Sequence, residues 1–131
     1  MIGLDTNVLV RFLVRDDEDQ FDRAQKLIRR EAQAGTPVLV SHLVLLETEW
    51  VLRSRYKLGK AEILGAFSDL MSAVDMSFED EHAVEEALFM WKNSPAQFAD
   101  CLVGARYGTF GCASTATFDA DAMKLPGFIA A

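Results

Sequence analysis

Acidic residues that follow apolar, strand-like segments are the first candidates for chemistry in this sequence. Asp5 comes directly after the apolar residues 2–4, and Asp119 comes directly after residues 112–118, which are rich in small and β-branched side chains. The carboxyl ends of parallel strands form the ligand crevice of an open α/β sheet, so acids at both places would face that crevice. The structural alternatives are a helix N-cap for Asp5 and an Asx turn for Asp119.

Two further carboxylates lie on predicted helices without a basic partner. The positions three and four residues from Glu47 and from Asp100 hold no lysine or arginine. Those around Glu47 are all apolar, which predicts surroundings in which its charge is unfavourable unless a cation or metal compensates it. The alternatives are a Glu47 that reaches water at the helix edge and an Asp100 that the helix dipole stabilises. By contrast, Glu49 has Arg53 four residues later, and this spacing predicts an ordinary surface ion pair.

The four carboxylates together point to a divalent cation. If they converge at one edge of a sheet, a hard cation must offset their repulsion, and ligands that are all oxygen favour Mg²⁺ or Mn²⁺ over zinc. The two histidines, His42 and His82, lack zinc-binding spacing. The sequence also has no glycine-rich phosphate-binding loop and no GxSxG elbow.

The elements that must position these acids alternate between short apolar runs and longer amphipathic ones. The pattern predicts strands over residues 2–4, 37–40, 76–78 and 112–118, and helices over 6–14, 18–34, 42–56, 60–74, 79–92 and 96–107, with a helical turn over 121–124. Ser41 is a predicted N-cap, and Gly35 is a predicted helix stop. This alternation predicts an α/β fold with a parallel sheet covered on both faces, and no domain boundary is visible.

Four segments in this order resemble the PIN-domain ribonucleases of the VapC type, the toxin half of bacterial toxin–antitoxin pairs. They are IGLDTNVLV at residues 2–10, Ser41 with ETEWVL at 47–52, FADCL at 98–102 and TFD at 117–119. The first segment alone is a weak signal, whereas all four at these separations are specific. The resemblance covers essentially the whole chain.

The resemblance implies a single domain over residues 1–131, with a three-layer α/β/α fold and a central, mainly parallel sheet of four to five strands. It places the acidic site on Asp5, Glu47, Asp100 and Asp119, with Asp121 as an alternative for the fourth acid. Asp5 and Asp100 would be metal ligands, Glu47 a ligand or a base that orients water, and Asp119 a ligand of a second ion. The supporting polar residues would be Thr6, Asn7, Ser41 and Thr117.

The activity implied is hydrolysis of RNA phosphodiester bonds with one or two Mg²⁺ or Mn²⁺ ions, which leaves 5′-phosphate and 3′-hydroxyl ends. Structured RNA such as tRNA is the usual target of the family. A homodimer and a cognate antitoxin are the implied partners. The antitoxin would contact apolar side chains on the early helices, for which core packing is the alternative: Phe12, Leu13 and Phe21.

The net charge of −7 excludes a protein that holds nucleic acid through bulk positive charge. Residues 1–60 carry ten basic against nine acidic residues, whereas residues 61–131 carry three against eleven. Basic residues of the first part are therefore candidates for RNA-phosphate contacts, with a solvated helix face as the alternative: Arg11, Arg15, Arg53, Arg55, Lys57 and Lys60.

Other classes of protein fit less well. No apolar run approaches the ~20 residues of a membrane-spanning helix, and no secretory leader is expected at the start. Cys101 and Cys112 lack CxxC spacing and are predicted to be buried free thiols, as in the reducing cytoplasm. The alternatives are a PIN-like scaffold without catalysis, a haloacid dehalogenase-type phosphatase and a receiver domain. Asn7 stands where the phosphatase needs a second aspartate, and the receiver's paired early acids are missing.

Overall fold

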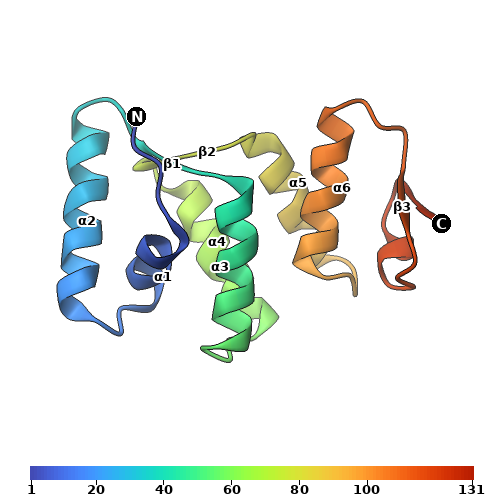
Figure 1. The fold of residues 1–131 in the computed structure, drawn as a ribbon, viewed down its shortest axis with the longest axis horizontal. Helices are drawn as coiled ribbons and strands as arrows, with labels where there is room; N and C mark the ends of the chain where they lie inside the picture. The colour runs from blue at the N-terminus through green and yellow to red at the C-terminus, as the bar shows by residue number, and fades with distance from the viewer. The chain divides into compact units, whose positions relative to one another are not determined.

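The computed structural model describes residues 1–131, which divide into two units, residues 1–79 and residues 80–131 (Figure 1). The single domain over the whole chain stays a prediction. No helix combines the length and the apolar character needed to cross a membrane.

Parallel strands lie at the centre of residues 1–79. Strand β1 (Val38–Val40) pairs with β2 (Met76–Phe78), with Val38 opposite Met76. On the other edge of β1, the Leu4 N–H donates to the Leu39 carbonyl at 2.9 Å, and Gly3 bridges Leu39 in the parallel sense. The predicted strand over residues 2–4 is therefore present as a short parallel neighbour of β1, and it leads directly into Asp5.

Four helices surround these strands, and side chains cap three of them. They are α1 (Thr6–Val14), α2 (Glu18–Gln33), α3 (His42–Ser54) and α4 (Lys60–Ser72). Side-chain oxygens of Asp5, Asp17 and Ser41 accept backbone N–H groups in the first turns of α1, α2 and α3. Helix α1 packs against both α2 and α3, and the buried Leu9 and Leu45 lie on these helices. This packing holds the first turn of α1 next to α3.

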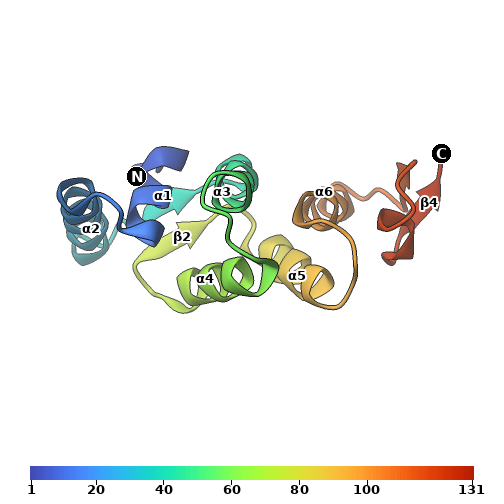
Figure 2. The same ribbon diagram turned by 90° about the horizontal axis from the view of Figure 1, so that it is seen from below.

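Residues 80–131 contain a helix pair and a second strand pair. Helices α5 (Glu81–Lys92) and α6 (Phe98–Thr109) pack against each other, with the Trp91 and Phe98 rings 5.2 Å apart (Figure 2). Strand β3 (Thr115–Thr117) pairs in parallel with β4 (Phe128–Ala130), and the 3₁₀ turn η1 (Ala122–Lys124) lies between them in the chain. Strand β4 is absent from the sequence prediction.

The α/β class is confirmed, because helices alternate with parallel strands. Each sheet has only two strands, so a central sheet of four to five strands and the three-layer arrangement stay predictions. The helix ends agree with the sequence to within a few residues, although α3 ends at Ser54 rather than Tyr56. One thiol prediction is wrong: Cys101 is buried as expected, but Cys112 is exposed, because it lies in the loop before β3 rather than within a strand.

Candidate active site

Asp5 lies between the first strand and helix α1. Its backbone is extended, with φ −81° and ψ 160°, and its Oδ1 accepts the Thr6 N–H at 2.8 Å. The N-cap alternative is therefore realised, since the carboxylate completes the hydrogen bonding of the first helical turn. The side chain is exposed, and Oδ2 accepts no hydrogen bond, so Asp5 can cap the helix and still offer an oxygen to a ligand.

Thr6 connects Asp5 to Glu47. Its hydroxyl donates to Oε1 of Glu47 on α3, while its backbone N–H is the donor to Asp5. Thr6 is buried, with 7% of its surface exposed, so this bridge is fixed by the packing of α1 against α3. The structure thus brings together two acids that lie 42 positions apart in the sequence.

The surroundings of Glu47 differ from the sequence expectation. Glu47 is exposed, and two of its apolar neighbours on α3, Leu43 and Trp50, are 77% and 58% exposed. Glu49 is the buried acid of this helix, with 4% exposed, and it holds the predicted ion pair with Arg53 at 2.8 Å. The pairing is confirmed, but its surface location is wrong, because Glu49 rather than Glu47 lies on the face of α3 that is turned to the core.

Asp100 and Asp119 form a second acidic pair, within residues 80–131. Asp100 is half-buried in the first turn of α6, and Asp119 is exposed just after β3. Burial, and next the negative charge of Asp119, raise the pKa of Asp100, while a hydrogen bond from the backbone of Gln97 lowers it. A carboxylate that is both desolvated and close to another acid gains from any cation bound beside it.

The choice between Asp119 and Asp121 for the fourth acid now has a structural basis. The Asp119 N–H donates to the Thr117 hydroxyl at 3.0 Å, and its Oδ1 accepts the Asp121 N–H at 3.0 Å, which is the predicted Asx turn. Asp121 pairs with Lys124 at 3.4 Å, and it does not influence the pKa of Asp100. Of these two acids, Asp119 is therefore the one whose negative charge raises the pKa of Asp100.

The other predicted supporting residues lie around α1 and α3. Ser41 is the N-cap of α3, because its hydroxyl accepts the Val44 N–H at 3.2 Å. Asn7 is exposed on the first turn of α1 and lines a groove.

Two of the predicted RNA-contacting arginines are held by neighbouring side chains. Arg11 donates to Gln20 at 2.7 Å and to the Tyr56 hydroxyl at 2.8 Å, and the hydrogen bond to Tyr56 raises its pKa. The Arg15 guanidinium stacks over the Phe21 ring, 3.9 Å from its centroid. Of the other two predicted contacts, Arg53 pairs with Glu49, and Arg55 is exposed at the end of α3 without an ion pair.

The apolar residues predicted to meet a partner belong partly to the core. Phe21 is buried, and Phe12 stacks on it at 5.8 Å between centroids. Leu13 is half-buried. Core packing thus accounts for Phe21 and for much of Phe12.

A polar network near α1, α2 and α3 was not predicted from the sequence. Tyr56 donates to Asp16, which also pairs with Arg11 at 3.3 Å. Asp16 and Tyr56 are 40 positions apart, so no local spacing rule connects them.

The donor chemistry of the two acidic pairs fits a hard divalent cation. All four side chains offer carboxylate oxygens, which Mg²⁺ and Mn²⁺ prefer. In neither unit do three or more histidine, cysteine, aspartate or glutamate side chains gather.

Comparison with known proteins identifies the family. No curated protein matches the chain. The model of the PIN domain matches residues 2–127, a range that includes all four acids and every helix and strand except β4. Because this match spans nearly the whole sequence, the chain belongs to the PIN-domain family, whose members are generally metal-dependent nucleases.

Proposed function

We propose that this protein is a metal-dependent endoribonuclease of the VapC type, the toxin of a toxin–antitoxin module. The observation that carries the proposal is the bridge from Thr6 to both Asp5 and Glu47, which holds two carboxylates of different elements at the end of the first strand. The Thr6 hydroxyl orients the exposed Glu47 beyond what the N-cap of α1 requires, and a metal site needs its ligands oriented.

The roles of the acids follow from their surroundings. Asp5 and Glu47 would hold a divalent cation through the oxygens that Thr6 leaves unbonded, and Asp100 and Asp119 would supply the remaining carboxylates. When bound, Mg²⁺ or Mn²⁺ supplies an activated water and stabilises the charge on the leaving 3′-oxygen. Thr6 keeps one oxygen of Glu47 occupied, so that the other remains directed to the ligand or to the attacking water. The Asx turn fixes the backbone from which Asp119 projects.

The proposed substrate is structured RNA such as tRNA, and the proposed partners are a cognate antitoxin and a second copy of the chain. The weakly basic charge balance of residues 1–60 supports recognition of a particular RNA rather than avid binding to any polyanion.

The test is cleavage of purified tRNA in Mg²⁺ or Mn²⁺, with EDTA as the blank. Asp5→Asn and Glu47→Gln are expected to abolish cleavage and keep the fold by circular dichroism. Asp69→Asn is the matched control, since Asp69 is exposed on α4 and makes no side-chain contact. Undiminished cleavage by purified Asp5→Asn would contradict the assignment. If the wild type neither cleaves RNA nor binds Mn²⁺ in a calorimetric titration, the protein is instead a PIN-like scaffold without catalysis.

The toxin role has its own test in the cell. Induced expression of the wild type is expected to arrest growth, whereas Asp5→Asn permits it. Co-expression of the short protein encoded directly upstream is expected to restore growth. Growth arrest by both forms would separate toxicity from the acidic site.

A further inference from the structure

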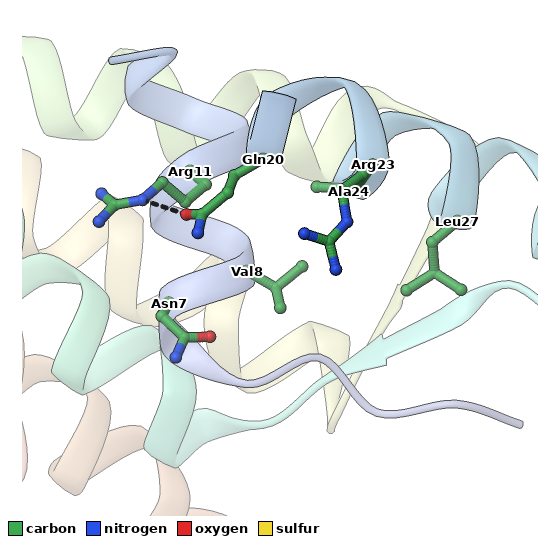
Figure 3. A pocket seen from close by; sticks show the side chains of 7 residues that line it. All are labelled: Asn7, Val8, Arg11, Gln20, Arg23, Ala24 and Leu27. Carbon is green, nitrogen blue, oxygen red and sulfur yellow. Dashed lines mark hydrogen bonds between the residues drawn. The ribbon is translucent and has the colours of Figure 1, made fainter. Parts of the chain in front are cut away.

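A groove lies between helices α1 and α2. It has a volume of about 450 Å³, and Figure 3 shows Val8 of α1 pointing to the α2 side, while the Arg11 guanidinium points away from Leu27. The lining residues are Asn7, Val8, Arg11, Gln20, Arg23, Ala24 and Leu27. The groove begins in the first turn of α1, two residues after the N-cap Asp5.

The lining combines an apolar base with cationic and amide groups. Val8, Ala24 and Leu27 are buried or half-buried, and they form the apolar part. The polar part is made of two guanidinium groups and two amides, and no carboxylate lines the groove. An apolar surface with a few polar groups, in a groove of a few hundred Å³, is typical of sites that bind small organic groups.

Several donors of this groove remain available to a ligand. The Asn7 side chain makes no hydrogen bond, so its amide offers both a donor and an acceptor. The hydrogen bonds to Gln20, Tyr56 and Asp16 use Nε and one terminal nitrogen of Arg11, and they hold the guanidinium in place while the second terminal nitrogen stays unbonded.

Arg23 is the exposed cation of the groove. Its side chain is 75% exposed, and its one partner is the 80% exposed Asp19 at 3.7 Å. An ion pair between two such exposed side chains contributes little, so Arg23 can turn to an anionic ligand with almost no loss of stability.

We propose that this groove binds one unpaired nucleotide of the RNA substrate, an inference that rests on the proposed ribonuclease function. The base lies against Val8, Ala24 and Leu27, the Asn7 amide hydrogen-bonds the edge of the base, and Arg23 contacts the phosphate. Bases splayed out of the RNA stack are the usual targets of such amide and apolar contacts, and arginine is suited to phosphate.

Binding of a fluorescent single-stranded RNA 12-mer in EDTA tests the phosphate contact without cleavage. Arg23→Ala is expected to weaken binding about 5- to 10-fold and to reduce the slope of log K against log salt by about 0.7, the value for one contact to single-stranded RNA. Arg29→Ala is the matched control, because Arg29 is exposed on the same helix outside the groove, and its effect should stay below about twofold. Equal losses in the two variants, or no measurable binding by the wild type, would overturn the proposal.

A second variant tests the base contact. Asn7→Ala is expected to weaken binding of the 12-mer about 3- to 10-fold, the size of one or two hydrogen bonds, and to leave binding of an abasic 12-mer unchanged. Equal losses with both oligomers would refute the base contact. If the groove does not bind a nucleotide, the wild type still cleaves RNA in Mg²⁺. If the protein is not a ribonuclease, the wild type does not cleave RNA at all, so the two outcomes are distinguishable. An acidic peptide that displaces the 12-mer while Arg23→Ala binds RNA normally would reassign the groove to a protein partner.

Discussion

At the scale of a single residue, Thr6 has the most direct influence on the candidate site. Thr6→Val keeps the shape and the buried methyl group but removes the hydroxyl that donates to Glu47. Loss of a residue that orients a metal ligand typically lowers metal affinity or activity 10- to 100-fold, so we expect a loss of about that size in tRNA cleavage and in Mn²⁺ affinity by calorimetry.

Thr6→Ser is the matched control for this prediction, because serine restores the donor. It is expected to recover most of the Mn²⁺ affinity. If Thr6→Val binds Mn²⁺ as tightly as the wild type, the bridge is structural and does not orient Glu47 for a ligand.

The raised pKa of Asp100 predicts that the stability of the fold depends on pH. Burial and then Asp119 raise its pKa, so its ionisation opposes folding. The contribution of its neutral form is fully present below the ordinary aspartate pKa of about 3.9 and is lost as the pH rises through the raised value. In EDTA, Asp100→Asn should therefore be more stable than the wild type at pH 7 and equally stable at pH 3.5.

The expected gain is below about 1 kcal/mol, because Asp100 is only half-buried and solvent screens its charge. Urea denaturation at the two pH values measures it. Asp69→Asn should show no such difference, since Asp69 is exposed on α4. A variant that is less stable than the wild type at pH 7 would mean that Asp100 serves the fold through its hydrogen bond with Gln97.

The contrast between Glu47 and Glu49 shows what the sequence can and cannot reveal. Helix α3 has apolar residues all round, so spacing alone does not tell which face meets the core. Glu47 has Leu43 and Trp50 as neighbours, which are exposed, whereas Glu49 has Leu45 and Leu52, which are 1% and 0% exposed. Both acids have apolar residues three or four positions away in the sequence, and packing against α1 and α4 sets the rotation of the helix.

At the scale of elements, local signals predict where helices begin better than where short strands lie. Side-chain caps at Asp5, Asp17 and Ser41 are short-range interactions, so the sequence alone locates these helix starts. Strand β4 has only three residues and no alternation, and its pairing with β3 is what makes it a strand. Non-local hydrogen bonds of this kind leave no periodic trace in the sequence.

Gly104 fixes how closely α6 approaches β4. A Cβ at this position would overlap the Phe128 ring, with its Cζ only 2.8 Å away, so the ring would have to shift. Gly104→Ala is therefore expected to destabilise the protein by about 1–3 kcal/mol, the usual result of overpacking a filled contact. Thermal and urea unfolding measure this loss.

Gly108 is the matched control on the same helix. Nothing lies within 4 Å of a Cβ placed there, and the residue is helical. Gly108→Ala should therefore stabilise the protein by about 0.5–1 kcal/mol, because alanine has the higher helix propensity. Equal effects of the two substitutions would show that Phe128 moves aside freely.

At the scale of the whole molecule, the acidic charge is distributed in a way that suits the proposed function. Residues 61–131 carry the excess of acidic residues behind the net charge of −7, and a cation bound at the proposed site would offset the charge of its carboxylates. The sequence identifies the family, because the motifs are local. It does not determine how many strands join into one sheet, because that depends on pairing between distant segments.

Binding of a divalent cation should therefore appear in the stability of the whole chain. A ligand that binds only the folded state adds about 2.7 kcal/mol at 100 times its Kd, which corresponds to several degrees in Tm for a chain of this length. We expect Mn²⁺ to raise the Tm of the wild type and of Asp69→Asn relative to EDTA at matched ionic strength. Asp5→Asn and Asp100→Asn should lose this shift, each compared with its own Tm in EDTA, since Asp100→Asn starts from a higher value. If all four proteins gain the same number of degrees, Mn²⁺ acts by screening the −7 charge rather than through the two acidic pairs.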